Sequence, residues 1–165
     1  MRQVSLIILT VLLFGAWSAC DHSPVFPVEP QIEFVDIQPR DVEHLRDSIG
    51  VTFRFQDGDG DLGSDNNEDF NLWFIDMRYD TSGVAQFTKE NLTIPYSLMN
   101  LTPDARKPSI QGEVSVELPV TINTPGFKEE FTRYEIILED RAGNRAIAID
   151  GSDRIFTEEI RIWRN

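Results

Sequence analysis

The chain has 165 residues, and 28 acidic against 15 basic residues give it a net charge of −13. This length predicts one domain with a hydrophobic core of its own. The negative charge argues against nucleic acid as a partner, because phosphate groups would be repelled.

The N-terminal segment has the organisation of an export signal. Arg2 supplies a positive charge, and a mainly apolar run extends over residues 4–19. A helix that crosses a bilayer needs roughly 20 such residues, so a permanent membrane-spanning anchor is the weaker interpretation. We therefore expect residues 1–19 to be a signal peptide.

The end of this segment indicates where the chain is cut. Ser18, Ala19 and Cys20 resemble the end of a bacterial lipobox, with Trp17 where that family prefers an aliphatic residue. The resemblance implies acylation of Cys20 and a lipid-anchored protein of the bacterial cell envelope, with the outer membrane favoured over the inner one. Simple secretion after cleavage at Ser18 or Ala19 is the alternative. Because Cys20 is the only cysteine, no internal disulfide can form.

A proline-rich segment separates this signal from the rest of the chain. Residues 20–30 contain Pro24, Pro27 and Pro30, a composition that favours an extended, semi-rigid spacer. The folded domain is then expected to occupy residues 31–165.

Alternating apolar residues predict that this domain is built from strands. Val51, Phe53 and Phe55 would share one face, and Thr52 and Arg54 the other. Strands are predicted over residues 32–37, 49–55, 70–79, 83–88, 112–118, 134–138, 146–149 and 155–163.

Three segments can be assigned a more specific role in the predicted fold. Residues 70–79 are apolar on both faces and should form a central strand, and residues 83–88 are a weaker edge candidate. A helical turn is expected only within residues 41–47. Short strands in this number favour a sandwich or a barrel.

The last predicted hairpin indicates which type of β fold to expect. Residues 134–146 resemble the final hairpin of bacterial immunoglobulin-like domains, in which a strand runs into Asp-x-Ala-Gly-Asn, here residues 140–144. Gly and Asn tolerate the positive φ of tight turns. We therefore expect an all-β fold, a single immunoglobulin-like β-sandwich of seven or eight strands.

An acidic stretch carries the clearest candidate chemistry. Five Asp and one Glu fall within residues 57–69, and such a density of like charge favours a hard cation with oxygen ligands. The spacing resembles an EF-hand type calcium loop, with Leu62 where that family has Gly and with no flanking helices predicted. The candidate metal ligands are Asp57, Asp59, Asp61, Asp65 and Glu68, with Asp140 of the hairpin as a further one.

The alternatives to calcium are an ion-free acidic turn and a zinc site. Asp-Gly pairs form good turns without an ion. Zinc is disfavoured, since Cys20 is committed to the anchor and only His22 and His44 remain, far apart in the sequence.

The function expected from the sequence is non-catalytic. The chain has no Gly-x-Ser-x-Gly elbow, phosphate loop or His-Glu-x-x-His motif. The leading hypothesis is a membrane-tethered, calcium-stabilised module with a structural, adhesive or envelope-assembly role, and with an envelope protein or a glycan as its partner. The alternatives are a glycan- or peptide-binding module and a hydrolase that uses the acidic loop.

Overall fold

The computed structural model describes residues 25–78, 93–102, 109–120 and 128–164, and its regular elements in these ranges are all β-strands. The all-β prediction is thereby confirmed. In chain order the strands are β1 (Gln31–Gln38), β2 (Asp41–Glu43), β3 (Ser48–Asp57), β4 (Leu72–Asp76), β5 (Thr93–Tyr96), β6 (Ile110–Pro119), β7 (Glu129–Thr132), β8 (Tyr134–Leu138), β9 (Ile147–Ala148), β10 (Ile155–Phe156) and β11 (Ile160–Trp163). Within the same ranges, no helix is long and apolar enough to cross a membrane.

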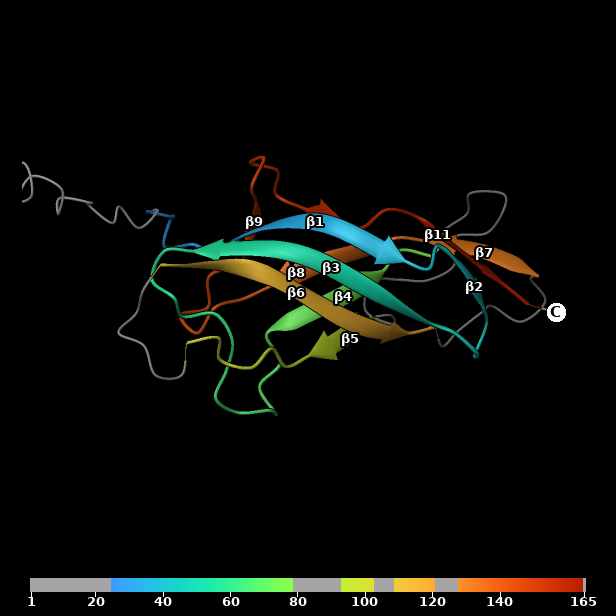
Figure 1. Cartoon of the computed structure of the whole chain (residues 1–165), viewed down its shortest axis with the longest axis horizontal. Coiled ribbons are helices and arrows are strands. Elements are labelled where there is room, and N and C mark those ends of the chain that lie inside the picture. Colours follow the sequence, from blue (N-terminus) through green and yellow to red (C-terminus); the bar gives the residue numbers. More distant parts are fainter. Residues whose placement is uncertain (1–24, 79–92, 103–108, 121–127, 165) are drawn as a thin grey trace, which may run out of the picture.

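Two four-stranded sheets form the body of the molecule. The first has the strand order β6-β3-β1-β9, and the second has the order β10-β8-β4-β5. In Figure 1 the first sheet lies in front of the second, and a three-stranded sheet, β2-β11-β7, continues the molecule toward the C-terminus. Two sheets stacked in this way are consistent with a β-sandwich.

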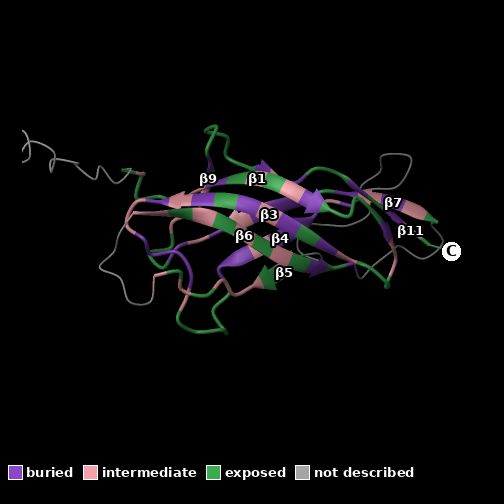
Figure 2. Ribbon diagram, viewed as in Figure 1, coloured by how far each residue is buried: buried purple, intermediate pink, exposed green. Residues whose placement is uncertain are grey.

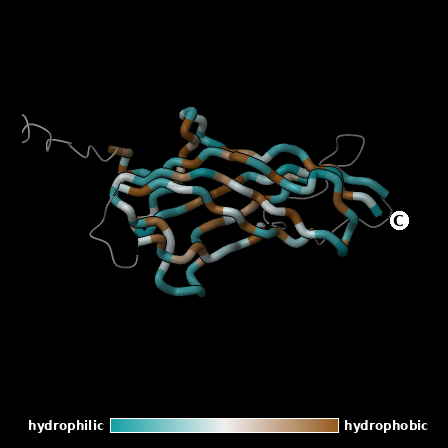
Figure 3. The backbone as a smooth tube through the Cα atoms, viewed as in Figure 1, coloured by the Kyte–Doolittle hydropathy of each residue, from teal (hydrophilic) through white to brown (hydrophobic). Residues whose placement is uncertain are grey.

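β3 lines one side of the core, as its alternation predicts. Val51, Phe53 and Phe55 are buried, whereas Arg54 between them is exposed. Figure 2 shows this banding of buried and exposed residues along β3, and Figure 3 shows it as alternating hydropathy. The buried set belongs to the same apolar cluster as Phe74 of β4, so the two sheets share one core.

β4 is the predicted central strand. It is flanked by β8 and β5, and at five residues it is shorter than the expected 70–79. The Phe74 ring packs edge-on against Tyr96 of β5, with ring centroids 5.9 Å apart. The position of this strand therefore follows from its apolar character on both faces.

The third sheet differs from the predictions in two places. Residues 41–47, expected to contain a helical turn, begin with β2, which pairs in parallel with β11. A turn does follow at residues 44–46, where the Arg46 and Asp47 amides donate to Glu43 O at 3.2 Å, but the φ of 60° at Leu45 is not helical. Residues 155–163, expected as one strand, form β10 in the second sheet and β11 in the third. The break falls at Thr157, whose amide donates to Tyr134 O at 2.9 Å and whose Oγ1 accepts from Tyr134 N at 2.9 Å. These bonds hold the chain where it crosses between sheets.

The strand count also differs from the expected seven or eight. The described ranges contain eleven strands, of which β2, β5 and β7 have no predicted counterpart. Strands of three or four residues carry too little alternation to be recognised in the sequence. The expected edge strand at 83–88 lies outside the described residues.

Candidate metal site

The acidic loop begins where β3 ends. Asp57 is the last residue of β3 and is fully buried, and the loop runs on from it at the end of the molecule opposite the third sheet (Figure 1). The strand thus fixes the first acidic side chain, and the turn that follows determines where the others lie.

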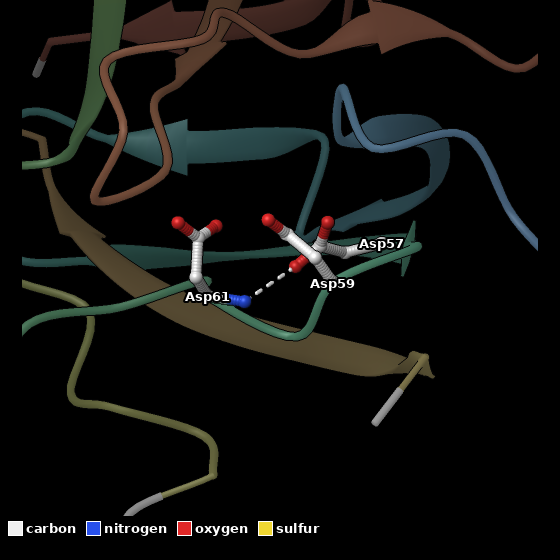
Figure 4. A group of neighbouring side chains, drawn as sticks. All are labelled: Asp57, Asp59 and Asp61. Carbon is white, nitrogen blue, oxygen red and sulfur yellow. Dashed lines mark hydrogen bonds between the residues drawn. The ribbon is translucent and has the colours of Figure 1, made fainter. Parts of the chain in front are cut away.

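Three carboxylates converge in this loop. One carboxylate oxygen from each of Asp57, Asp59 and Asp61 lies within 4.8 Å of the others. Figure 4 shows the three side chains rising from the same side of the loop, and the Asp61 amide donates to Asp57 Oδ2 at 2.9 Å. Gly60 lies between the last two with a φ of 69°, a left-handed conformation that glycine adopts at little cost.

Each of these carboxylates has a buried oxygen without a hydrogen-bond donor. Among the described residues, the Oδ1 atoms of Asp57, Asp59 and Asp61 are inaccessible to solvent and unpartnered. Asp57 is fully buried and Asp61 is only 4% exposed, so water does not solvate these oxygens freely. Buried polar atoms are normally satisfied, and an exception points to a missing partner such as an ion.

The electrostatics of the loop agree with this geometry. The pKa of Asp61 is raised to about 6, chiefly by burial and then by the charges of Asp140, Asp59 and Asp57. Burial also raises the pKa of Asp57, against the opposing hydrogen bond from the Asp61 amide. Without a cation, these carboxylates are held where negative charge is unfavourable.

Asp140 borders this trio. It pairs with Leu62 in an isolated antiparallel bridge, and the Arg141 amide donates to Asp61 O at 3.2 Å. Its two oxygens accept from the amide and the side chain of Asn144, at 2.8 and 2.7 Å. Asp140 is therefore close enough for its charge to act on Asp61, but its oxygens already have donors and lie outside the compact group.

The hairpin that contains Asp140 turns where its sequence predicts. Glu139 pairs with Arg145, and Gly143 adopts a φ of 86°. The Asn144 side chain closes the turn by donating to Asp140. The turn residues therefore account for the local geometry, and the fold carries Asp140 to the acidic loop.

Asp65 and Glu68 do not join the trio. Both are exposed; Asp65 accepts a hydrogen bond from the Asn100 side chain at 2.7 Å, and the Glu68 amide donates to Asn66 Oδ1 at 3.1 Å. The reason is Leu62, which is fully buried in the core and so anchors the chain where a calcium loop of the EF-hand type has its glycine turn. Beyond this anchor the loop follows a separate path.

Two segments that are distant from the loop in the sequence hold it in place. Ser64 pairs with Met99 in a parallel bridge, and Thr102 Oγ1 donates to Gly60 O at 2.7 Å. On another side, the backbone of Phe26 and Pro27 lies against Gly58. In the sequence, the only signal of this close backbone approach is the presence of three glycines in the loop, Gly58, Gly60 and Gly63.

The donor set suits a hard divalent cation. Calcium binds six to eight oxygen atoms, and three aspartates can supply up to six of them. His44 follows β2 in the third sheet, where its amide donates to Trp163 O at 2.9 Å, and His22 lies outside the described residues. The trio contains neither nitrogen nor sulfur ligands, which disfavours zinc.

The chain matches no known protein family model, no curated protein and no solved structure.

Proposed function

We propose that this chain is a non-catalytic, calcium-stabilised module with an immunoglobulin-like β-sandwich, held at the bacterial cell envelope by an acylated Cys20. Its role is structural or adhesive, as one part of an envelope assembly. The cation joins Asp57, Asp59 and Asp61 and thereby fixes the loop at the end of the sandwich from which the N-terminal segment leaves.

One observation carries the calcium part of this proposal. One carboxylate oxygen from each of the three aspartates lies within 4.8 Å of the others, and each aspartate also has a buried Oδ1 atom without a hydrogen-bond partner. A calcium ion would satisfy all three atoms and neutralise the charge that raises the pKa of Asp61. A lone cysteine excludes an internal disulfide, so a metal ion is an available way to brace an exported domain.

Calcium should raise the melting temperature of the protein after treatment with a chelator. At a concentration 100-fold above the Kd, the added stability is about 2.7 kcal/mol, or on the order of 10 °C for a domain of this size. Asp61→Asn should lose most of this shift. Its metal-free form should melt no lower than the wild type, because the amide removes like-charge repulsion.

Glu68→Gln is the matched control for this experiment. It removes the same charge from the same loop, but its side chain is exposed and outside the trio, so the calcium shift should persist. The shift should also shrink below about pH 6, where calcium must displace a proton from Asp61. An equal calcium response in the two variants, or none in the wild type, would count against the site.

Attachment to the membrane depends on Cys20 and is tested separately. Cys20→Ser should move the protein from the membrane fraction to the soluble fraction, because serine does not offer the thiol that is acylated. The measurement is detergent-free fractionation of cells that produce each form. A variant that stays with the membranes as fully as the wild type would show that another feature anchors the chain.

A further inference from the structure

We infer that the cation at Asp57, Asp59 and Asp61 also docks the N-terminal segment, residues 25–30, against the domain, so that calcium controls how firmly the domain is held relative to its anchor. This inference rests on the calcium site proposed above. It adds a second consequence of metal binding, which is a change outside the loop itself.

The first argument is the contact at Gly58, which lies between two of the three carboxylates. A Cβ atom on Gly58 would lie 2.4 Å from both Phe26 O and Pro27 O. Backbone therefore packs directly on backbone, and only glycine permits the approach. In Figure 1 the blue chain ahead of β1 lies beside the end of β3, in agreement with this contact.

The second argument is that both valines of this segment are exposed. Val25 is 95% exposed and Val28 is 54% exposed, so their side chains bury little apolar surface. The Ile147 amide donates to Pro30 O at 3.1 Å, which fixes the end next to β1. Upstream of Pro30, the backbone of Phe26 and Pro27 lies directly against Gly58.

The third argument links that contact to the cation. Asp57 and Asp59 flank Gly58, so a backbone movement that separates their charges also moves the surface on which the segment rests. Without a cation the buried carboxylates favour an opened loop in which water can reach them. With a cation bound, Gly58 is held in the position that receives Phe26 and Pro27.

This coupling must act in both directions. If calcium favours docking of the segment by some factor, docking favours calcium binding by the same factor. Couplings of this kind are commonly about 5–150-fold. A change confined to the contact at Gly58 should therefore weaken calcium binding although every carboxylate is retained.

The test uses the full chain and elastase, which cleaves after small aliphatic residues and can attack the bonds after Val25 and Val28. Calcium should slow both cleavages about tenfold or more, as followed by mass spectrometry. Gly58→Ala should be cleaved in calcium as fast as the chelated wild type, and calorimetry should show a similar factor of loss in calcium affinity. Gly50→Ala is the control, since its Cβ would lie an ordinary 3.7 Å from Gln38 O.

The outcomes separate this inference from the calcium site itself. If the wild type binds no calcium in the calorimeter, the proposed site fails and the inference fails with it. If the wild type binds calcium while its cleavage after Val25 and Val28 is unchanged, the site stands and the docking inference is overturned. This wild-type comparison decides the matter even if Gly58→Ala does not fold.

Discussion

Replacing Arg78 with alanine is expected to destabilise the domain by about 3–5 kcal/mol, because it leaves buried negative charge without its cation. The Arg78 guanidinium donates to Asp76 Oδ2 at 2.7 Å and to Glu130 Oε2 at 3.2 Å. All three side chains are buried, and Thr132 also donates a hydrogen bond to Asp76. The group joins the end of β4 to β7, so its loss should loosen the third sheet from the second.

Arg54 provides a matched control on the outer face of β3. It too lies between two carboxylates, at 2.8 Å from Glu33 and 3.0 Å from Glu113, but all three side chains are about half exposed. Arg54→Ala should cost less than about 1 kcal/mol, since water solvates the charges that remain. Urea denaturation of the two variants measures both free energies of unfolding. Losses of similar size would contradict the role given to burial.

The long strands were predictable because the alternation of apolar and polar residues within each strand determines which face is buried. Over the ten residues of β3, burial alternates with the sequence, and β3 pairs along its whole length with β6. A pattern of this length outweighs local exceptions, since a slip of one residue would turn every apolar side chain toward water. The core of the first sheet therefore followed from the sequence.

The third sheet was not predictable in the same way. β2 and β7 have three and four residues, and each pairs with β11, which lies more than 25 residues further along the chain. Glu130 belongs to a polar stretch that resembles a solvated surface, yet it is fully buried. Its partner Arg78 is 52 residues away, and only the tertiary fold brings the two together.

The candidate site also has a part that the sequence predicts and a part that depends on tertiary packing. The spacing of Asp57, Asp59 and Asp61 predicted that their carboxylates meet, because two glycines allow the backbone to curl between them. The same counting extended the site to Glu68, whereas the buried Leu62 redirects the chain before it reaches that residue. The spacing of acidic residues therefore predicts the site correctly as far as Asp61. Beyond Asp61, the packing of Leu62 in the core determines the path of the chain.

Gly63→Ala should be the most damaging single change next to the site. Gly63 has a φ of 85°, and a Cβ there would lie 2.2 Å from Met99 O. The left-handed conformation alone costs a non-glycine residue about 1–2 kcal/mol, and the collision with backbone adds about 1–3 kcal/mol of overpacking strain. Urea denaturation should show a total loss of about 2–5 kcal/mol, because neither backbone segment can yield as a flexible side chain would.

Gly151→Ala separates the two causes of this loss. Gly151 has a φ of 83°, but nothing lies within 4 Å of an added Cβ, so only the conformational cost of about 1–2 kcal/mol should remain. Gly63→Ala should also weaken calcium binding in calorimetry, because Ser64 N–H donates to Leu98 O at 2.8 Å and that pairing closes the loop beyond Asp61. Calcium affinity should be unchanged in Gly151→Ala. Equal losses of stability in the two variants would mean that the contact with Met99 does not hold the loop closed. Unchanged calcium affinity in Gly63→Ala would mean that the three aspartates form their site without that contact.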